Sequence, residues 1–125
     1  MTSNKLAPII IFTYNRTTDI KQTISALKEN FLSKDSDLYI FSDYANKNED
    51  IEAVKEVREF LHSIEGFKSI KIIERESNYG LAKNIIEGVT EIINIHGNFR
   101  KKMYSSLYLE NREKIYLKGV GIFKR

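Results

Sequence analysis

Seven residues in three separate stretches of this chain could together bind a planar, polar and negatively charged ligand. They are Tyr14, Asn15, Arg16, Asp43, Asn78, Gly80 and Lys83. The first stretch offers an aromatic ring, an amide and a guanidinium. The second offers one carboxylate, which can accept a hydrogen bond from a base imide or a ribose hydroxyl. The third precedes an expected helix, whose free N–H groups suit a diphosphate, and Arg75 adds a further cation there.

The same residues also have a purely structural interpretation. Asp43 could close its own turn through an Asx-type hydrogen bond. Asn78 could cap the following helix, and Gly80 could simply be a turn residue. The residue types alone leave both interpretations open.

The apolar pattern predicts elements that would bring the three stretches together. Apolar runs at 7–14, 37–44 and 69–74 predict strands, the first of them covered on both faces. Apolar residues at helical spacing predict helices that begin after Thr17 or Thr18 as cap, near residue 51 and near residue 81. The β-α-β-α-β-α order favours an α/β three-layer sandwich with a mostly parallel sheet, in which ligands bind beyond the carboxyl ends of the strands.

Length and composition exclude several classes of protein. A chain of 125 residues with 42% hydrophobic and 30% charged residues predicts a globular fold with one core. The absence of cysteine excludes disulfides, thiolate metal sites and thiol nucleophiles. No signal peptide is visible, and no apolar run approaches the roughly 20 residues of a membrane span. We therefore expect a cytoplasmic protein with no transmembrane segment.

The first polar stretch lacks three common signatures. It has no Gly-x-Gly-x-x-Gly for a dinucleotide and no Gly-Lys-Ser/Thr ending of a P-loop. It also has no acidic pair of the kind that holds magnesium in receiver domains. A nicotinamide or flavin cofactor, a Walker-type ATPase and a receiver domain are all disfavoured.

The positive charge is concentrated at the end of the chain. Residues 1–98 hold 12 Lys and Arg against 15 Asp and Glu, whereas residues 99–125 hold 8 against 2. We therefore place a boundary near residue 97, between an α/β unit at 1–97 and a basic segment with interleaved aromatic residues at 98–125. Cations and aromatic rings could hold phosphates and bases, but we interpret the segment as a solvated end and do not expect nucleic acid as a partner.

Three motifs taken together resemble the family 2 glycosyltransferases of the GT-A fold. They are the segment 7–16, Phe41-Ser42-Asp43, and Asn78-Tyr79-Gly80-Leu81-Ala82 followed by Gly88-Val89-Thr90. The resemblance extends from residue 6 to about residue 97. Within the family, the chain is similar to the bacterial and archaeal sugar transferases labelled hemolytic-protein or HlpA-like.

The resemblance implies that the unit 1–97 binds a nucleotide-diphosphate sugar, most plausibly a UDP-sugar, for transfer to a hydroxyl acceptor. Tyr14, Asn15 and Arg16 would line the nucleoside pocket, and Asp43 would hydrogen-bond the base. A second group would lie near the ribose and the diphosphate: Asn78, Gly80 and Lys83.

The family pattern also implies an acidic motif that holds Mg²⁺ or Mn²⁺ on the diphosphate. Here the corresponding stretch reads Leu109-Glu110-Asn111-Arg112, so the motif is absent. Glu110 is a weak candidate for a metal ligand, and we interpret it rather as a surface partner of Arg112. No catalytic base can be identified, so the catalytic residues stay unknown.

We therefore expect the nucleotide-binding half of a glycosyltransferase, a truncated GT-A fold whose segment 98–125 has diverged or been truncated. Whether the chain is active as an enzyme is left open, because the acidic metal motif and the acceptor half are missing. The alternative is a non-catalytic interaction or dimerisation module of the same ancestry. Three strands leave an exposed sheet edge, which could pair with a second copy, as could the C-terminal segment.

Overall fold

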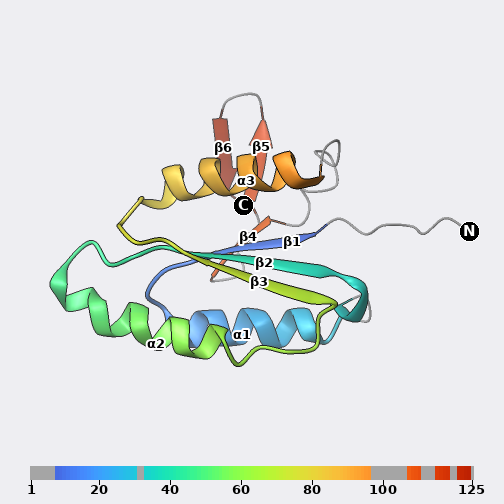
Figure 1. The fold of residues 1–125 in the computed structure, drawn as a ribbon, viewed down its shortest axis with the longest axis horizontal. Coiled ribbons are helices and arrows are strands. Elements are labelled where there is room, and N and C mark those ends of the chain that lie inside the picture. The colour runs from blue at the N-terminus through green and yellow to red at the C-terminus, as the bar shows by residue number, and fades with distance from the viewer. Residues whose placement is uncertain (1–7, 31–32, 97–106, 111–114, 119–120, 125) are drawn as a thin grey trace, which may run out of the picture.

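The structure, a computed structural model, describes residues 8–30, 33–96, 107–110, 115–118 and 121–124 (Figure 1). Helices and strands alternate along the first 96 residues. In chain order the elements are β1 (Ile9–Thr13), α1 (Thr17–Lys28), η1 (Ser33–Asp35), β2 (Asp37–Ser42), η2 (Asn48–Asp50), α2 (Ile51–Leu61), β3 (Ser69–Glu74), α3 (Leu81–His96), β4 (Leu107–Leu109), β5 (Ile115–Lys118) and β6 (Gly121–Lys124).

The main sheet contains four parallel strands in the order β3-β2-β1-β4. Residues 9–13 of β1 pair with residues 38–42 of β2, and residues 10–12 pair with residues 107–109 of β4. The chain therefore runs outward from β1 to β3 and then returns to the other side of β1. Such a reversal is the place where parallel sheets open a crevice beyond their carboxyl ends. A separate antiparallel pair joins β5 and β6.

Helices cover both faces of this sheet, which gives three layers (Figure 1). On one face α3 packs against Ile10 and Phe12 of β1, and on the other face α1 and α2 pack against Ile11. The alternation along β1 follows from the period of two in a strand. The α/β class, the mostly parallel sheet and the predicted element order are confirmed.

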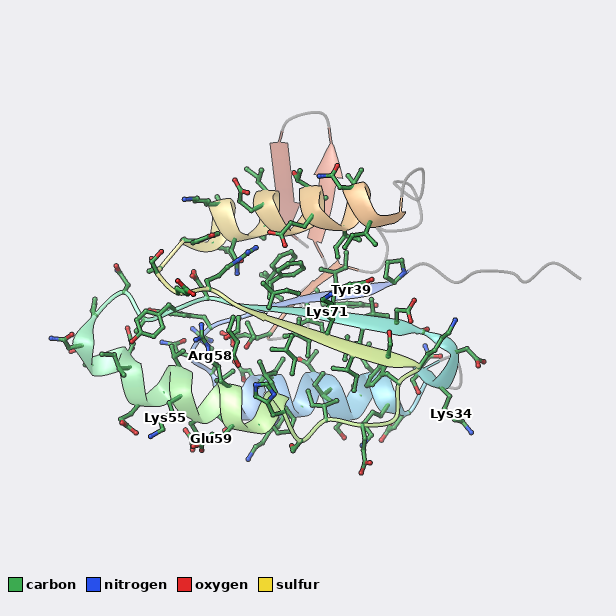
Figure 2. All side chains as sticks on the ribbon, viewed as in Figure 1. Lys34, Tyr39, Lys55, Arg58, Glu59 and Lys71 are labelled. Atoms are coloured by element: carbon green, nitrogen blue, oxygen red, sulfur yellow. The ribbon has the colours of Figure 1, made fainter. Side chains whose placement is uncertain are left out.

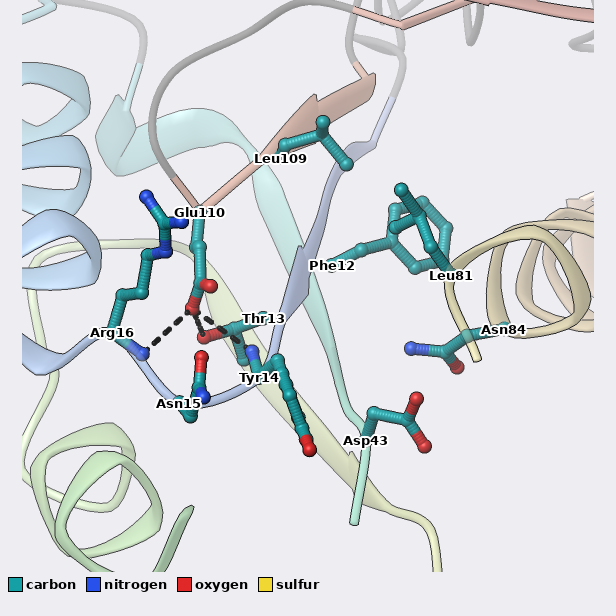
Figure 3. Close-up of a pocket in the computed structure, with 10 residues that line it drawn as sticks. All are labelled: Phe12, Thr13, Tyr14, Asn15, Arg16, Asp43, Leu81, Asn84, Leu109 and Glu110. Atoms are coloured by element: carbon teal, nitrogen blue, oxygen red, sulfur yellow. Dashed lines mark hydrogen bonds between the residues drawn. The ribbon is translucent and has the colours of Figure 1, made fainter. Parts of the chain in front are cut away.

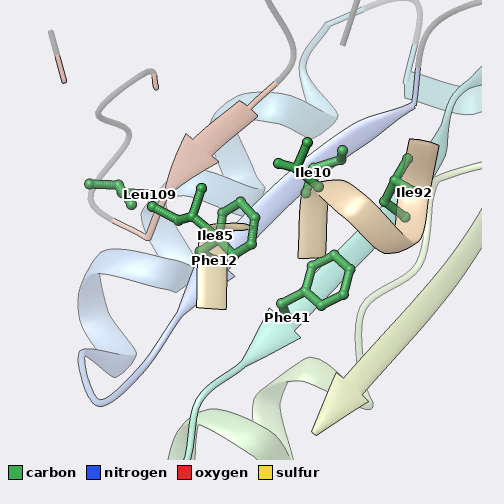
Figure 4. Packing of buried hydrophobic residues seen from close by; sticks show 7 residues of the cluster. Ile10, Phe12, Phe41, Ile85, Ile92 and Leu109 are labelled. Atoms are coloured by element: carbon green, nitrogen blue, oxygen red, sulfur yellow. The ribbon is translucent and has the colours of Figure 1, made fainter. Parts of the chain in front are cut away.

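Glycine at position 88 sets how closely α3 approaches the sheet. The rings of Phe12 and Phe41 stack with centroids 5.4 Å apart, and they lie beneath this helix (Figure 4). A Cβ atom at Gly88 would lie 2.8 Å from Cε1 of Phe12 and 3.2 Å from Phe41, so only glycine fits here without displacement. Gly88 therefore allows α3 to pack this closely against the two rings.

Arg58 of α2 fastens the carboxyl ends of β2 and β3 to each other (Figure 2). It donates from Nε to the Ser42 hydroxyl at 2.9 Å, and from Nη2 to the carbonyls of Ser42 at 3.1 Å and of Arg75 at 2.9 Å. Hydrogen bonds from a charged donor are stronger than neutral ones. The edge of the sheet that faces the candidate site is therefore held in one arrangement.

Two expectations about these elements are wrong. The sequence predicted three strands, but the sheet has a fourth strand, β4. The boundary near residue 97 stays a prediction. The residue that precedes α1 is Arg16 and no side chain caps the helix, so neither threonine does so. Instead, the Thr17 hydroxyl donates to Glu56 at 3.1 Å.

Within the described residues, no helix is both long and apolar enough to cross a membrane.

Candidate functional site

A cavity of about 540 Å³ opens at the carboxyl ends of β1, β2 and β4, where the order of the strands reverses (Figure 3). Its lining residues are Phe12, Thr13, Tyr14, Asn15, Arg16, Asp43, Leu81, Asn84, Leu109 and Glu110. Four of the seven predicted residues therefore surround one space. They are the three residues of the loop after β1 and Asp43 at the end of β2.

Glu110, at the end of β4, holds the loop that follows β1. Its Oε1 accepts hydrogen bonds from the Thr13 hydroxyl at 2.8 Å, the Tyr14 N–H at 2.9 Å and the Arg16 N–H at 3.4 Å, drawn as dashed lines in Figure 3. Thr13 is almost fully buried, with 2% of its surface exposed. The pair with Arg112 stays a prediction, because Arg112 lies outside the described residues. The hydrogen bonds to Glu110 fix the shape of the loop that lines the cavity.

Asp50, at the end of η2, holds the same loop from a second side. The Tyr14 hydroxyl donates to its Oδ2 at 3.2 Å, and the Asn15 amide donates to its Oδ1 at 3.2 Å. The Tyr14 oxygen also accepts a hydrogen bond from the N–H of Asn46 at 3.0 Å. Burial raises the pKa of Tyr14, which the Asn46 contact partly offsets and the Asp50 charge reinforces. The phenol is therefore a neutral group at physiological pH.

Asp43 holds the third predicted stretch against the end of β2. Its Oδ1 accepts hydrogen bonds from the N–H groups of Tyr44 at 2.9 Å and Tyr79 at 2.8 Å. Its Oδ2 accepts from the N–H of Gly80 at 3.0 Å and from the Asn78 amide at 3.4 Å. With 5% of its surface exposed, Asp43 is a buried carboxylate whose charge these donors compensate. The contact with a ligand base stays a prediction.

The other three predicted residues do not line the cavity. Asn78 does not directly precede α3, because the helix begins at Leu81 and its first hydrogen bond runs from the Asn84 N–H to the Gly80 carbonyl. The Asn78 amide donates to the Tyr44 carbonyl at 2.8 Å and to Asp43. Gly80 has φ of +81°, a left-handed conformation that favours glycine, and α3 begins at the next residue. The Lys83 ammonium lies 4.5 Å from the centroid of the Tyr79 ring. Asn78 and Gly80 therefore contact Asp43 from outside the cavity lining.

Arg75, expected as a cation for a diphosphate, is instead part of the buried framework. Only 7% of it is exposed, and its guanidinium lies between the rings of Phe41 at 5.1 Å and Tyr79 at 4.6 Å. It donates from Nη1 to Glu91 at 3.0 Å and from Nε to the Asn84 side-chain oxygen at 3.0 Å. Its charge is therefore neutralised within the protein.

Sequence reasoning missed Asn84, Asp50 and the role of Glu110. Asn84 is 2% exposed and lies on the face of α3 that carries the buried Ile85 and Ile92. A polar residue on that apolar face is the signal that could have found it. Asp50 lies in a short polar run with nothing in its residue types to distinguish it.

Among the described residues, the carboxylates that line the cavity, where the resemblance implies Mg²⁺ or Mn²⁺, are Asp43 and Glu110. Within the described part of the chain, no group of three or more His, Asp or Glu side chains gathers to hold a metal. Both oxygens of Asp43 accept hydrogen bonds from the protein, whereas the hydrogen bonds to the Glu110 side chain all end on its Oε1. The metal that the family pattern implies therefore stays a prediction for this chain.

Comparison with protein families gives one finding. The model of the family described as Glycosyl transferase family 2 matches residues 9–92. Comparison with curated proteins gave no match, and comparison with solved structures gave none either. The matched range runs from the start of β1 into α3 and includes all seven predicted site residues. Since these 84 residues are more than half of the 125, the chain belongs to glycosyl transferase family 2.

Proposed function

We propose that this chain binds a nucleotide-diphosphate sugar, with a UDP-sugar as the donor, in the cavity beyond β1, β2 and β4. The sugar of this donor would then be transferred to a hydroxyl group of an acceptor. The observation that carries the proposal is the convergence of Tyr14, Asn15, Arg16 and Asp43 on one cavity in a chain of this family. The HlpA-like subgroup and the cytoplasmic location stay predictions.

The cavity has the size and the mixed lining that such a ligand requires. About 540 Å³ lies within the range of small-molecule sites. Phe12, Leu81 and Leu109 supply apolar surface for a planar base or a sugar ring. The Arg16 guanidinium and the Asn84 amide nitrogen are the donors of the lining that can fix its orientation.

Arg16 is the group best placed for a phosphate. It is the one cation among the ten described residues that line the cavity. Its side chain is 65% exposed, and its ion pair with Asp19 is long, at 3.4 Å. Exposed ion pairs of this kind contribute little to stability, so the Arg16 guanidinium can leave Asp19 and turn toward a diphosphate.

Titration calorimetry with UDP, uridine and UDP-glucose tests the proposal. Arg16→Ala should weaken UDP binding roughly 5- to 20-fold, the worth of one charge-assisted hydrogen bond, and leave uridine binding unchanged. Lys34→Ala is the matched control, because Lys34 lies on η1, at the amino end of the sheet (Figure 2). Absence of binding by any nucleotide or nucleotide sugar to the unaltered protein would overturn the proposal.

A second candidate function, a homodimerisation module, rests on the edge of the sheet. Among the described strands, β3 pairs with β2 alone, so one side of its backbone is open to another strand. A second copy could add its own β3 there. Light scattering at increasing concentration tests this candidate, and a strict monomer would contradict it.

A further inference from the structure

We propose that Asn84 is a specificity-determining residue of this cavity: its amide is a fixed hydrogen-bond donor, which selects a nucleotide base with a keto oxygen over one with an amino group. The inference rests on the proposed function, because it concerns the same cavity. It assigns to the ligand the class of keto bases, of which uracil is one.

The orientation of the Asn84 amide follows from the chemistry of its neighbour. Arg75 donates from Nε to the Asn84 side chain at 3.0 Å. A guanidinium has donors only, so the atom that faces it must be the amide oxygen. The NH₂ group must then point the other way. Figure 3 shows the nitrogen directed into the space between Phe12 and Asp43.

Arg75 is itself held in place, so it keeps the Asn84 amide in this orientation. Its guanidinium lies between two aromatic rings, at 5.1 Å from Phe41 and 4.6 Å from Tyr79, and it pairs with Glu91 at 3.0 Å. If the Asn84 amide flipped, its N–H groups would face the N–H of a buried cation, leaving opposed donors without acceptors. The donor in the cavity is therefore held by contacts that a ligand does not touch.

No acceptor among the described residues competes with a ligand for the N–H groups of the Asn84 amide. The neighbouring carboxylate, Asp43, already accepts four hydrogen bonds from residues 44 and 78–80. Among the described residues, no group accepts a hydrogen bond from the Asn84 nitrogen. A keto oxygen at this position would complete the pair, whereas an amino group would bring two donors face to face.

Uracil and cytosine differ in this way at one ring position and are nearly equal in size. Placing an amino group against a fixed buried donor should lower affinity by about 10-fold or more, the usual effect of an unsatisfied polar group. The unaltered protein should therefore bind UDP more tightly than CDP by this factor.

Asn84→Asp provides a test that reverses the preference. The carboxylate would keep one oxygen on Arg75 and present the other to the cavity, so an acceptor would replace the donor. We expect the ratio of UDP to CDP affinity to fall to one or below. The added charge would repel both diphosphates alike, so the ratio is the informative quantity, and uridine against cytidine repeats the test without phosphates.

Three outcomes are decisive. A ratio that moves as described supports the inference. An unchanged ratio in a folded Asn84→Asp protein that still binds UDP overturns the inference and leaves the proposed function standing. Absence of nucleotide binding to the unaltered protein overturns both. Should Asn84→Asp fail to fold in thermal unfolding, Asn84→Ser decides the question, because loss of the amide should move the ratio toward one and an unchanged ratio would contradict the inference.

Discussion

Replacing Glu110 with alanine should loosen the loop after β1 and destabilise the whole chain. The Glu110 carboxylate accepts hydrogen bonds from the Thr13 hydroxyl, the Tyr14 N–H and the Arg16 N–H. Thr13 is 2% exposed, so its hydroxyl would lose its acceptor inside the protein. The Arg16 contact is long and exposed and contributes little. Two hydrogen bonds to a charged group, partly replaced by water from the cavity, give a loss of about 2–4 kcal/mol in the free energy of unfolding.

Urea unfolding followed by circular dichroism measures this loss. Glu110→Gln keeps an oxygen acceptor of the same reach without the charge and should cost only about 1 kcal/mol. Glu59→Ala removes an exposed glutamate from α2 and should change the free energy of unfolding by less than about 0.5 kcal/mol. If Glu110→Ala behaved like Glu59→Ala, the carboxylate would not be what holds the loop.

Three further predictions can be checked with the same unfolding assay. Gly88→Ala should lower the free energy of unfolding by about 1–3 kcal/mol, because its Cβ would lie 2.8 Å from Phe12. Gly80→Ala should cost about 1 kcal/mol from its φ of +81° alone, since nothing lies within 4 Å of the added Cβ; a loss as large as that of Gly88→Ala would contradict this. Burial raises the pKa of Tyr14 above its ordinary value of 10.0, so the folded state keeps this proton longer than the unfolded chain. The stability that it contributes is complete below pH 10 and lost as the pH rises through the folded pKa, so Tyr14→Phe should flatten the decline in stability above pH 10. Part of the decline should persist, because burial also raises the pKa of Tyr39, and an unaltered slope would refute the assignment to Tyr14.

The sequence was informative where local pattern and global fold agree. The strand at 69–74 was predicted with its observed bounds, because isoleucines are concentrated between polar turns. Parallel strands place their carboxyl ends at one edge, which is why Asn15 and Asp43 could be expected around one cavity. Neither inference needed knowledge of side-chain packing.

The fourth strand could not be read from the sequence because its signal is too short. β4 has three residues, and it pairs with β1, which lies almost 100 residues earlier in the chain. A run of that length shows no period, so only the pairing itself defines it. The role of Glu110 was hidden with it, because that residue reaches the loop only when β4 lies beside β1.

The contact between Asn84 and Arg75 could not be predicted for a different reason. Whether the two side chains meet depends on the height of α3 above the sheet, which Gly88 sets through its approach to Phe12. Spacing along the chain carries no information about that height. Polar pairs of this kind are visible only once helices and strands have been placed.

The hydrogen bonds at the carboxyl edge show a division between acceptors and donors. Asp43, Asp50 and Glu110 each accept hydrogen bonds from loops of the protein, so their charges hold the walls of the cavity. Two other groups of the lining, Arg16 and the Asn84 nitrogen, are donors, which complement the oxygens of a diphosphate and a keto base. Removing one of the acids would therefore release a loop. A loss of UDP binding in Asp43→Ala would not show whether Asp43 contacts the ligand or only holds the loop at residues 78–80 in place. The two donors can be changed while these carboxylate contacts stay in place, so the nature of the ligand is best read from Arg16 and Asn84.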